Sequence, residues 1–267
     1  MHILNCRRFG FATCVVTLLS VLPAFSQVAK SGRTQRSIVG LPAGAVVVEV
    51  EPLPLTAHAD RILVLWMQSP AKHPREMDGE AYTCPERTRG SYYSGPTRIS
   101  LVNTQSGEII NTVRVTIRSV TESAGNRKER EDDRFDIPYL IKRDLYRVDA
   151  LGRGREGKPK IIDLKDYNAD GRALEFALFN AESCSDVAVQ LIGYSTSKDQ
   201  VVQYAFRSVT DRGDEKPWFW ADNLFAHKPV SNGHWHYTMT FPGATCVFDY
   251  RYRSANEDFL TETSCGQ

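Results

Sequence analysis

The chain lacks the sequence motifs of the common enzyme classes. It contains no GxSxG nucleophile elbow, no HExxH helix and no P-loop. Carboxylates are plentiful, but no two of them can be assigned the roles of general acid and general base from the sequence. These absences favour a non-catalytic protein and leave a hydrolase with dispersed carboxylates as the alternative.

Long hydrophobic runs are confined to the N-terminus. Arg7 and Arg8 precede an apolar run over residues 9–22, and small residues stand just before Gln27. That order is typical of an export signal, and the run is shorter than the roughly 20 residues of a membrane span. We therefore predict a signal peptide over residues 1–26, a secreted or periplasmic location and no transmembrane segment after cleavage.

Neither sign of charge is in excess. The chain has 33 lysines and arginines against 32 aspartates and glutamates, a formal net charge of +1. Removal of Arg7 and Arg8 with the signal changes +1 to −1. A nearly neutral chain has no global field that attracts nucleic acid or anionic lipid. Nucleic acid is therefore not an expected partner.

Cysteines are few, and none lies in a CxxC pair, which argues against the common zinc and redox motifs. Four remain after the signal, an even number in a chain bound for an oxidising compartment. Two disulfides are expected, and four cysteines allow three pairings. We predict that Cys246 pairs with Cys265, which would hold the C-terminal segment, and that Cys84 pairs with Cys184.

No long stretch shows the 3.6-residue periodicity of an amphipathic helix. Period-two and continuous β-branched runs dominate instead. The expected strands cover residues 45–51, 61–68, 97–103, 108–118, 160–164, 175–180, 187–195, 200–207, 234–241 and 245–253. These patterns predict an all-β fold, either an antiparallel sandwich or a propeller-like meander with long loops.

The composition divides the mature chain into an arm and a domain. Residues 27–44 are mostly polar and basic, which predicts a flexible arm. Residues 45–267 form a β-rich domain, with a candidate boundary near the glycine-rich residues 151–159. The charge run over residues 121–134 predicts a solvated loop.

Oxygen-bearing side chains recur at alternate positions of one short segment, Asp166, Asn168 and Asp170, and Gly171 follows directly. Alternate side chains of a tightly curled loop converge on one point, and glycine permits the sharp turn. Together with the carbonyl of Arg172, these groups match the first ligands of an EF-hand-like loop. The spacing predicts a site for a hard cation, with calcium as the expected cofactor.

The second half of this segment, the aspartate loop (residues 166–175), departs from the EF-hand pattern. Ala177 stands where an EF-hand requires a bidentate glutamate, so a true EF-hand is excluded. Glu175 is the carboxylate expected to complete the coordination, one position later than in short aspartate loops, and Asp163 is a more distant candidate. The displaced ligand predicts weak binding, with a Kd of about 10⁻⁴–10⁻³ M. A metal-free turn rich in Asn, Asp and Gly is the competing interpretation.

Residues 166–171, entered from one expected strand and left through another, resemble the calcium loop of FG-GAP/VCBS-type exported β-proteins. The resemblance covers about twenty residues and is a short motif. It implies a structural calcium ion that joins two strands, and it implies no enzymatic activity. The whole chain also resembles exported bacterial proteins of unassigned function.

Two further groups of residues have the chemistry of a binding site. Trp218 and Trp220 belong to an aromatic cluster that could stack on a sugar ring, with burial in the core as the competing interpretation. His234 and His236 are two positions apart in an expected strand and therefore share a face. Two imidazoles could hold zinc or copper, but the sequence names no third ligand.

These observations predict an exported, non-catalytic β-protein with a structural calcium loop, which binds an unidentified extracellular ligand or surface. The alternative is an extracellular carbohydrate-active hydrolase, which the aromatic cluster and the abundant carboxylates motivate.

Overall fold

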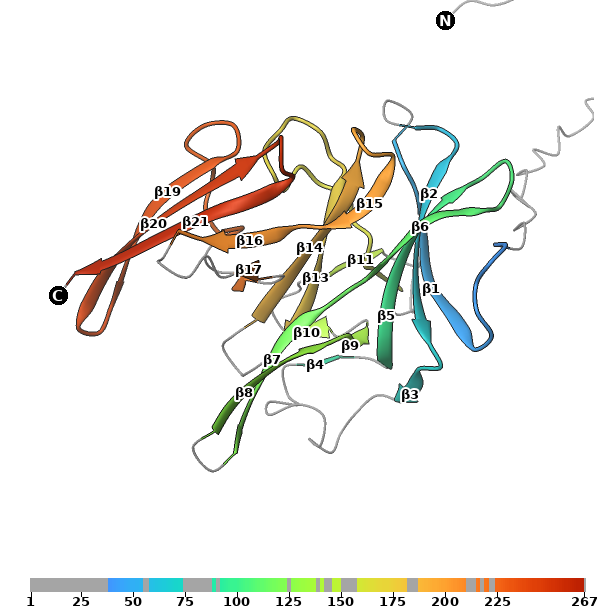
Figure 1. Cartoon of the computed structure of the whole chain (residues 1–267), viewed down its shortest axis with the longest axis horizontal. Helices are drawn as coiled ribbons and strands as arrows, with labels where there is room; N and C mark the ends of the chain where they lie inside the picture. The colour runs from blue at the N-terminus through green and yellow to red at the C-terminus, as the bar shows by residue number, and fades with distance from the viewer. Residues whose placement is uncertain are drawn as a thin grey trace, which may run out of the picture. The chain divides into compact units, whose positions relative to one another are not determined.

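In the computed structural model the described residues are 38–54, 58–73, 88–89, 92–123, 126–137, 140–141, 146–149, 158–181, 187–209, 215–216, 219–220 and 224–266 (Figure 1). All of them belong to one compact unit, Ser37–Gln267. They contain strands and no α-helix. No helix in this part of the chain is therefore long and apolar enough to cross a membrane. The predicted signal peptide and residues 27–37 lie outside the described ranges.

The strands follow one another as β1 (Ala45–Pro52), β2 (Arg61–Gln68), β3 (Ala71–His73), β4 (Thr88–Arg89), β5 (Tyr92–Asn103), β6 (Ile109–Arg114), β7 (Ile117–Ser123), β8 (Asn126–Asp132), β9 (Arg134–Ile137), β10 (Leu140–Ile141), β11 (Arg147–Asp149), β12 (Lys158–Lys160), β13 (Glu175–Ala181), β14 (Val187–Ser195), β15 (Gln200–Gln203), β16 (Ala205–Ser208), β17 (Glu215–Lys216), β18 (Phe219–Trp220), β19 (His234–Phe241), β20 (Ala244–Arg253) and β21 (Asp258–Gly266).

The first large sheet has six strands, in the order β1-β2-β5-β3, and β6 and β9 also pair with β5. Its strand β2 is apolar on both faces. Leu63 and Leu65 belong to the main core, while Val64 faces the other side. Ile38 and Leu41 pack against that other side. The described end of the expected arm therefore contacts the sheet, and burial on two faces explains why β2 reads as a continuous apolar run.

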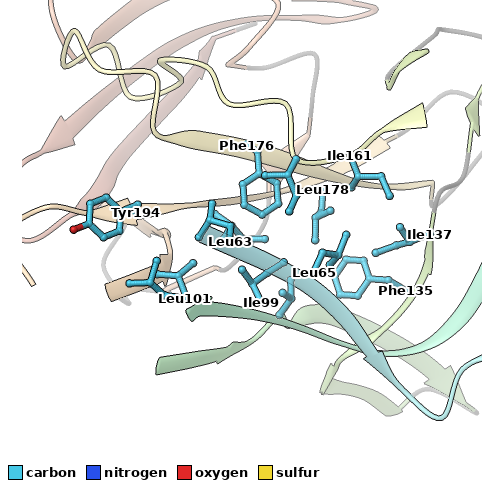
Figure 2. Packing of buried hydrophobic residues seen from close by; sticks show 14 of the residues in the cluster. Leu63, Leu65, Ile99, Leu101, Phe135, Ile137, Ile161, Phe176, Leu178 and Tyr194 are labelled. Carbon is cyan, nitrogen blue, oxygen red and sulfur yellow. The ribbon is translucent and has the colours of Figure 1, made fainter. Parts of the chain in front are cut away.

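The second sheet has four strands, β13-β14-β15 with β18 beside β14. Phe176 and Leu178 of β13 belong to the same buried cluster as Leu65 of β2 and Ile99 of β5 (Figure 2). The two sheets thus contribute their apolar faces to one core, as in a sandwich. The prediction of an all-β fold with antiparallel sheets is confirmed.

Side-chain amides join the edges of these two sheets. Asn111 of β6 donates to the carbonyl of Val201 (2.8 Å) and accepts its N–H (3.0 Å). Gln203 of β15 makes the same two bonds to the backbone of Thr116, at 2.9 and 3.0 Å. Each amide takes the place of a strand residue, so the backbone groups of Val201 and Thr116 find partners without a continuous ladder.

The third sheet has five strands in the order β17-β16-β21-β20-β19. Its β16–β21 pair is parallel and its other pairs are antiparallel. Phe206, Trp235 and Phe259 lie in a second buried cluster, which also contains Val189 and Leu191 of β14. This second core therefore connects the C-terminal sheet to the four-stranded sheet.

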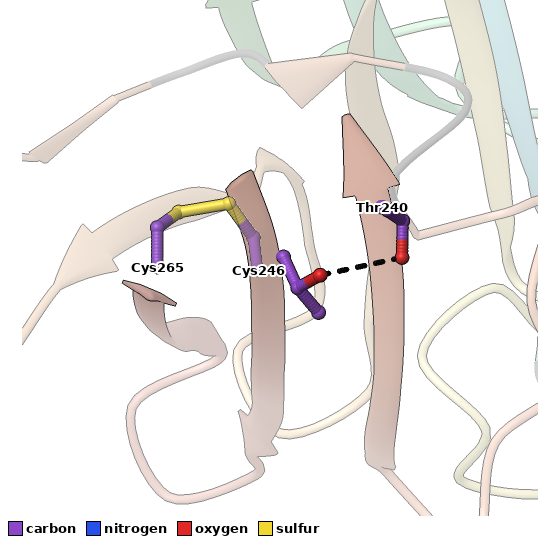
Figure 3. The surroundings of a disulfide bond; sticks show 4 residues. Thr240, Cys246 and Cys265 are labelled. Atoms are coloured by element: carbon purple, nitrogen blue, oxygen red, sulfur yellow. Dashed lines mark hydrogen bonds between the residues drawn. A yellow bond between two sulfur atoms is a disulfide. The ribbon is translucent and has the colours of Figure 1, made fainter. Parts of the chain in front are cut away.

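A disulfide joins Cys246 of β20 to Cys265 of β21 (Figure 3). The two residues are direct partners in the antiparallel register of these strands. On the other side of β20, the Thr240 and Thr245 hydroxyl oxygens lie 3.4 Å apart. The predicted Cys246–Cys265 pairing is confirmed. Cys84 and Cys184 lie outside the described residues.

The predicted loop over residues 121–134 is wrong. β7 and β8 form a hairpin in which Ile117 pairs with Asp132 and Ser123 with Asn126. The segment has almost no apolar residues, and a period-two pattern is the signal by which strands are recognised. Backbone pairing needs no such pattern, so this hairpin gave no sequence signal. The candidate boundary near residues 151–159 falls mostly outside the described ranges.

Candidate metal-binding site

A side chain of the first sheet holds the segment that leads into the aspartate loop. The Glu49 carboxylate accepts the N–H of Ile161 (2.8 Å) and the N–H of Ile162 (3.1 Å). Both isoleucines are buried. Because these two N–H groups bond to a side-chain carboxylate and not to a neighbouring strand, the strand pairing stops and β12 ends at Lys160. The expected strand over residues 160–164 is therefore wrong beyond its first residue.

The turn of the aspartate loop is wound around the Asp166 carboxylate. Its two oxygens accept the N–H of Asp170 (3.0 Å) and the N–H of Gly171 (2.9 Å). The Asn168 side-chain oxygen also accepts the Asp170 N–H, at 3.0 Å. Ala169 and Gly171 have positive φ angles of 56° and 91°. The glycine at this position therefore supplies a backbone conformation that other residues adopt only with strain.

Arg172 closes the turn from the solvent side. Its N–H donates to Asp170 Oδ1 at 2.9 Å, and its guanidinium donates to Asp170 Oδ2 at 2.7 Å. Another guanidinium nitrogen donates to the Thr196 hydroxyl at 2.7 Å. The predicted ligand at this residue, its carbonyl oxygen, accepts the N–H of Leu174 at 3.1 Å.

Glu175 lies beneath the turn, with only 1% of its surface exposed. Its carboxylate accepts three hydrogen bonds, from the Tyr167 N–H (3.2 Å), the Asn168 amide (3.1 Å) and the Tyr204 hydroxyl (3.3 Å). Burial, and then the negative charge of Asp170, raises the pKa of Glu175 to about 8. The hydrogen bonds oppose this shift but do not cancel it.

The structure brings the five predicted ligand residues into one turn, in two layers. Asp166 and Arg172 are exposed and Asp170 is half-buried, whereas Asn168 and Glu175 are buried. Within the described residues, no three carboxylates of this loop lie within 4.8 Å of one another. Each carboxylate oxygen that accepts one N–H still has a lone pair for a cation. The arrangement can therefore present oxygen ligands from neighbouring side chains.

The pattern in the sequence gave no sign of Gly193 or Tyr204, which shape the space around Glu175. Gly193 of β14 is the register partner of Glu175. A Cβ at position 193 would lie 2.9 Å from Glu175 Cγ and 3.0 Å both from the Leu174 carbonyl oxygen and from Tyr204 Cε2. A glycine inside a strand is the one available signal, since it often marks a close approach of this kind.

Gly193→Ala is expected to destabilise the fold by about 1–3 kcal/mol, the usual range for overpacking. The added methyl group meets a backbone carbonyl, which cannot turn away as a flexible side chain would. Urea unfolding monitored by circular dichroism measures the loss. Gly266→Ala is the matched control, because a Cβ there meets no atom within 4 Å. Equal stability of the two variants would contradict the assigned role of Gly193.

The aromatic cluster is described only in part. Trp218 lies outside the described residues, and β18, which contains Trp220, pairs with β14 at Ala188 and Val189. The expectation that these tryptophans bind a sugar ring stays a prediction.

The two histidines of β19 acquire a third polar neighbour from β20. Asp249 is the register partner of His236, and its Oδ2 lies 2.9 Å from His234 Nε2 and 3.2 Å from His236 Nδ1. Arg251 donates to the other carboxylate oxygen at 2.8 Å. Partial burial alone would raise the pKa of Asp249. The hydrogen bonds with His234, His236 and Arg251 together outweigh burial, so the pKa of Asp249 lies below its usual value.

Comparisons with known proteins give no assignment. No family model, no curated protein and no solved structure matches the chain.

Proposed function

We propose that this chain is an exported, non-catalytic β-sheet protein whose aspartate loop binds a calcium ion. The observation that carries the proposal is the winding of the 170 and 171 N–H groups around the Asp166 carboxylate. An Asp166 oxygen and the Asn168 oxygen both accept the Asp170 N–H, and calcium loops likewise collect ligands from alternate positions of a tight turn. The ion has a structural role, and the recognition surface for an extracellular ligand lies on the scaffold that it stabilises.

The charge distribution of the loop supports a cation. Asp166 has no cationic partner among the described residues, and Glu175 lies beneath the same turn. The negative charges of Asp170 and Asp166 both disfavour ionisation of Glu175. A divalent cation among these groups would offset that mutual repulsion and would favour the ionised carboxylate.

The ion pair between Arg172 and Asp170 has to open when the cation binds. The Arg172 side chain is 54% exposed, and exposed ion pairs contribute about 0–1 kcal/mol. Its loss therefore costs little compared with calcium coordination. The same competition agrees with weak affinity, in the range of about 10⁻⁴–10⁻³ M that is found for extracellular modules.

Calcium titration of the purified protein tests the proposal. At a calcium concentration ten times the Kd, ligand binding stabilises the folded state by about 1.4 kcal/mol, so thermal unfolding in 10 mM calcium is expected at a higher temperature than in chelator. Isothermal titration calorimetry should give one site per chain.

Two carboxylate variants locate the calcium site. Asp166→Asn is expected to abolish both the shift and the heat, because it removes the charge around which the turn is wound. Glu108→Gln, which neutralises an exposed carboxylate in the first-sheet region, should leave both unchanged. If native protein shows neither a heat of binding nor a shift in 10 mM calcium, the proposal is wrong.

A further inference from the structure

A compact group of metal-ligand side chains, none of which belongs to the aspartate loop, lies on the third sheet. His234 and His236 are alternate residues of β19, so their side chains extend from the same face. Asp249 of β20 is directly opposite His236. One potential ligand atom from each of the three residues lies within 4.8 Å of the other two. No other such group of histidine, cysteine or carboxylate side chains occurs among the described residues.

Two of the three separations between these atoms are close to those in a tetrahedral metal site, and the ligand atoms of the two histidines lie within 4.8 Å of each other. Bonds of about 2.0–2.1 Å from zinc to nitrogen and oxygen place neighbouring ligands about 3.3 Å apart. The Asp249 oxygen lies 2.9 Å from His234 Nε2 and 3.2 Å from His236 Nδ1. Separations of a few tenths of an ångström below the tetrahedral value can be adjusted by side-chain rotation alone. The backbone register therefore already brings the three ligand side chains together.

We propose that His234, His236 and Asp249 bind a divalent transition-metal ion of the zinc class. Two imidazoles and one carboxylate make three protein ligands, and the fourth position opens to solvent because the His236 side chain is 54% exposed. An open fourth position holds water or a ligand supplied from outside the chain. Imidazole nitrogen favours zinc, copper and nickel over calcium, so this site and the aspartate loop select different ions.

Neighbouring charged residues orient the Asp249 carboxylate and affect its affinity for a metal ion. Arg251 Nε donates to Asp249 Oδ1 at 2.8 Å, which leaves Oδ2 directed at the two histidines. A partner that fixes a ligating carboxylate in this way is typical of metal sites. The guanidinium charge lowers affinity, but the Arg251 side chain is 60% exposed and its charge is screened by water. Glu262 of β21 is the register partner of Asp249 and adds a negative charge next to it.

The test is zinc binding to purified protein without a polyhistidine tag, by isothermal titration calorimetry in chelator-free buffer. We expect one zinc ion per chain at this site, undisturbed by an excess of calcium. His234→Ala, His236→Ala and Asp249→Asn should each weaken binding at least tenfold, since loss of even an outer-shell partner costs about 10–100-fold. Thermal unfolding without metal shows whether each variant is folded.

A matched histidine controls for surface binding. His58 Nδ1 lies 3.6 Å from Asp60 Oδ1, and the His58 side chain is 45% exposed. Among the described residues no second histidine joins this pair. His58→Ala should leave zinc affinity unchanged. Electron paramagnetic resonance of Cu²⁺ on the native protein is an independent measurement and should show coupling to two imidazole nitrogens. Absence of stoichiometric zinc binding, an affinity unchanged in both His234→Ala and His236→Ala, or a copper spectrum without nitrogen coupling would overturn the proposal.

Discussion

Glu175→Gln is expected to remove most of the loss of stability that the native protein undergoes between pH 5 and pH 8. The pKa of Glu175 is raised from 4.5 to about 8 in the folded protein, chiefly by burial. Between these two values the unfolded chain releases this proton while the folded chain retains it. The free energy of unfolding therefore falls as the pH rises, by about 1.4 kcal/mol per pH unit. The whole effect is on the order of 5 kcal/mol and is complete above pH 8.

Urea unfolding at pH 5 and pH 8, in the presence of chelator, measures this effect as the difference between native protein and variant. Glutamine has the same size, and its single oxygen can replace Oε2, which accepts the Tyr167 N–H, while the bond from the Asn168 amide to Oε1 is lost at both pH values. The Tyr204 hydroxyl can accept from the new amide instead of donating. Glu108→Gln controls for the loss of a carboxylate in an exposed position. A pH dependence that is identical in native protein and Glu175→Gln would refute the assigned protonation.

Replacing both Cys246 and Cys265 by alanine is expected to lower the free energy of unfolding by about 3 kcal/mol. The two residues are separated by 19 positions in the sequence. Without the bond the unfolded chain regains the freedom of that loop, which is the source of the stabilisation in the chain-entropy account. Guanidinium unfolding of the double variant against the native protein measures the change.

Thr240→Ala is the control for the disulfide variant. It removes the contact between the Thr240 and Thr245 hydroxyls, which lies beside the disulfide in Figure 3 and is exposed. A surface substitution of this kind is expected to change stability by about 0.5 kcal/mol or less. A double cysteine variant no less stable than Thr240→Ala would contradict the prediction.

The sequence was sufficient for the fold class and for most strands because those strands are apolar on at least one face. β2 and β14 are the clearest cases, since both are buried almost throughout. β21 was not predicted, although it lies inside the third sheet. Its last residues, 262–266, are exposed and include no aliphatic or aromatic side chain, so this part of the strand has no period-two signal.

The candidate site was predictable only where its geometry is local. The spacing of Asp166, Asn168 and Asp170 led to the expectation of a curled loop, and their side chains do bond to the backbone of one turn. The burial of Glu175 depends on Tyr204, which lies between β15 and β16 and is distant in sequence, and on the space left by Gly193. In the same way, Asp249 joins His234 and His236 only through the register of two strands. Tertiary pairing of this kind has no counterpart in the linear spacing of residues.

The position of β21 constrains the order in which the third sheet can assemble. Residues 258–266 are synthesised after every other strand of that sheet, yet they lie between β16 and β20. Until they emerge, β16 has no neighbour on that side, and the parallel pairing of Phe206 with Phe259 cannot form. The hairpin of β19 and β20 can close early because its contacts are local, whereas its connection to β16 within the sheet must wait for translation of this segment.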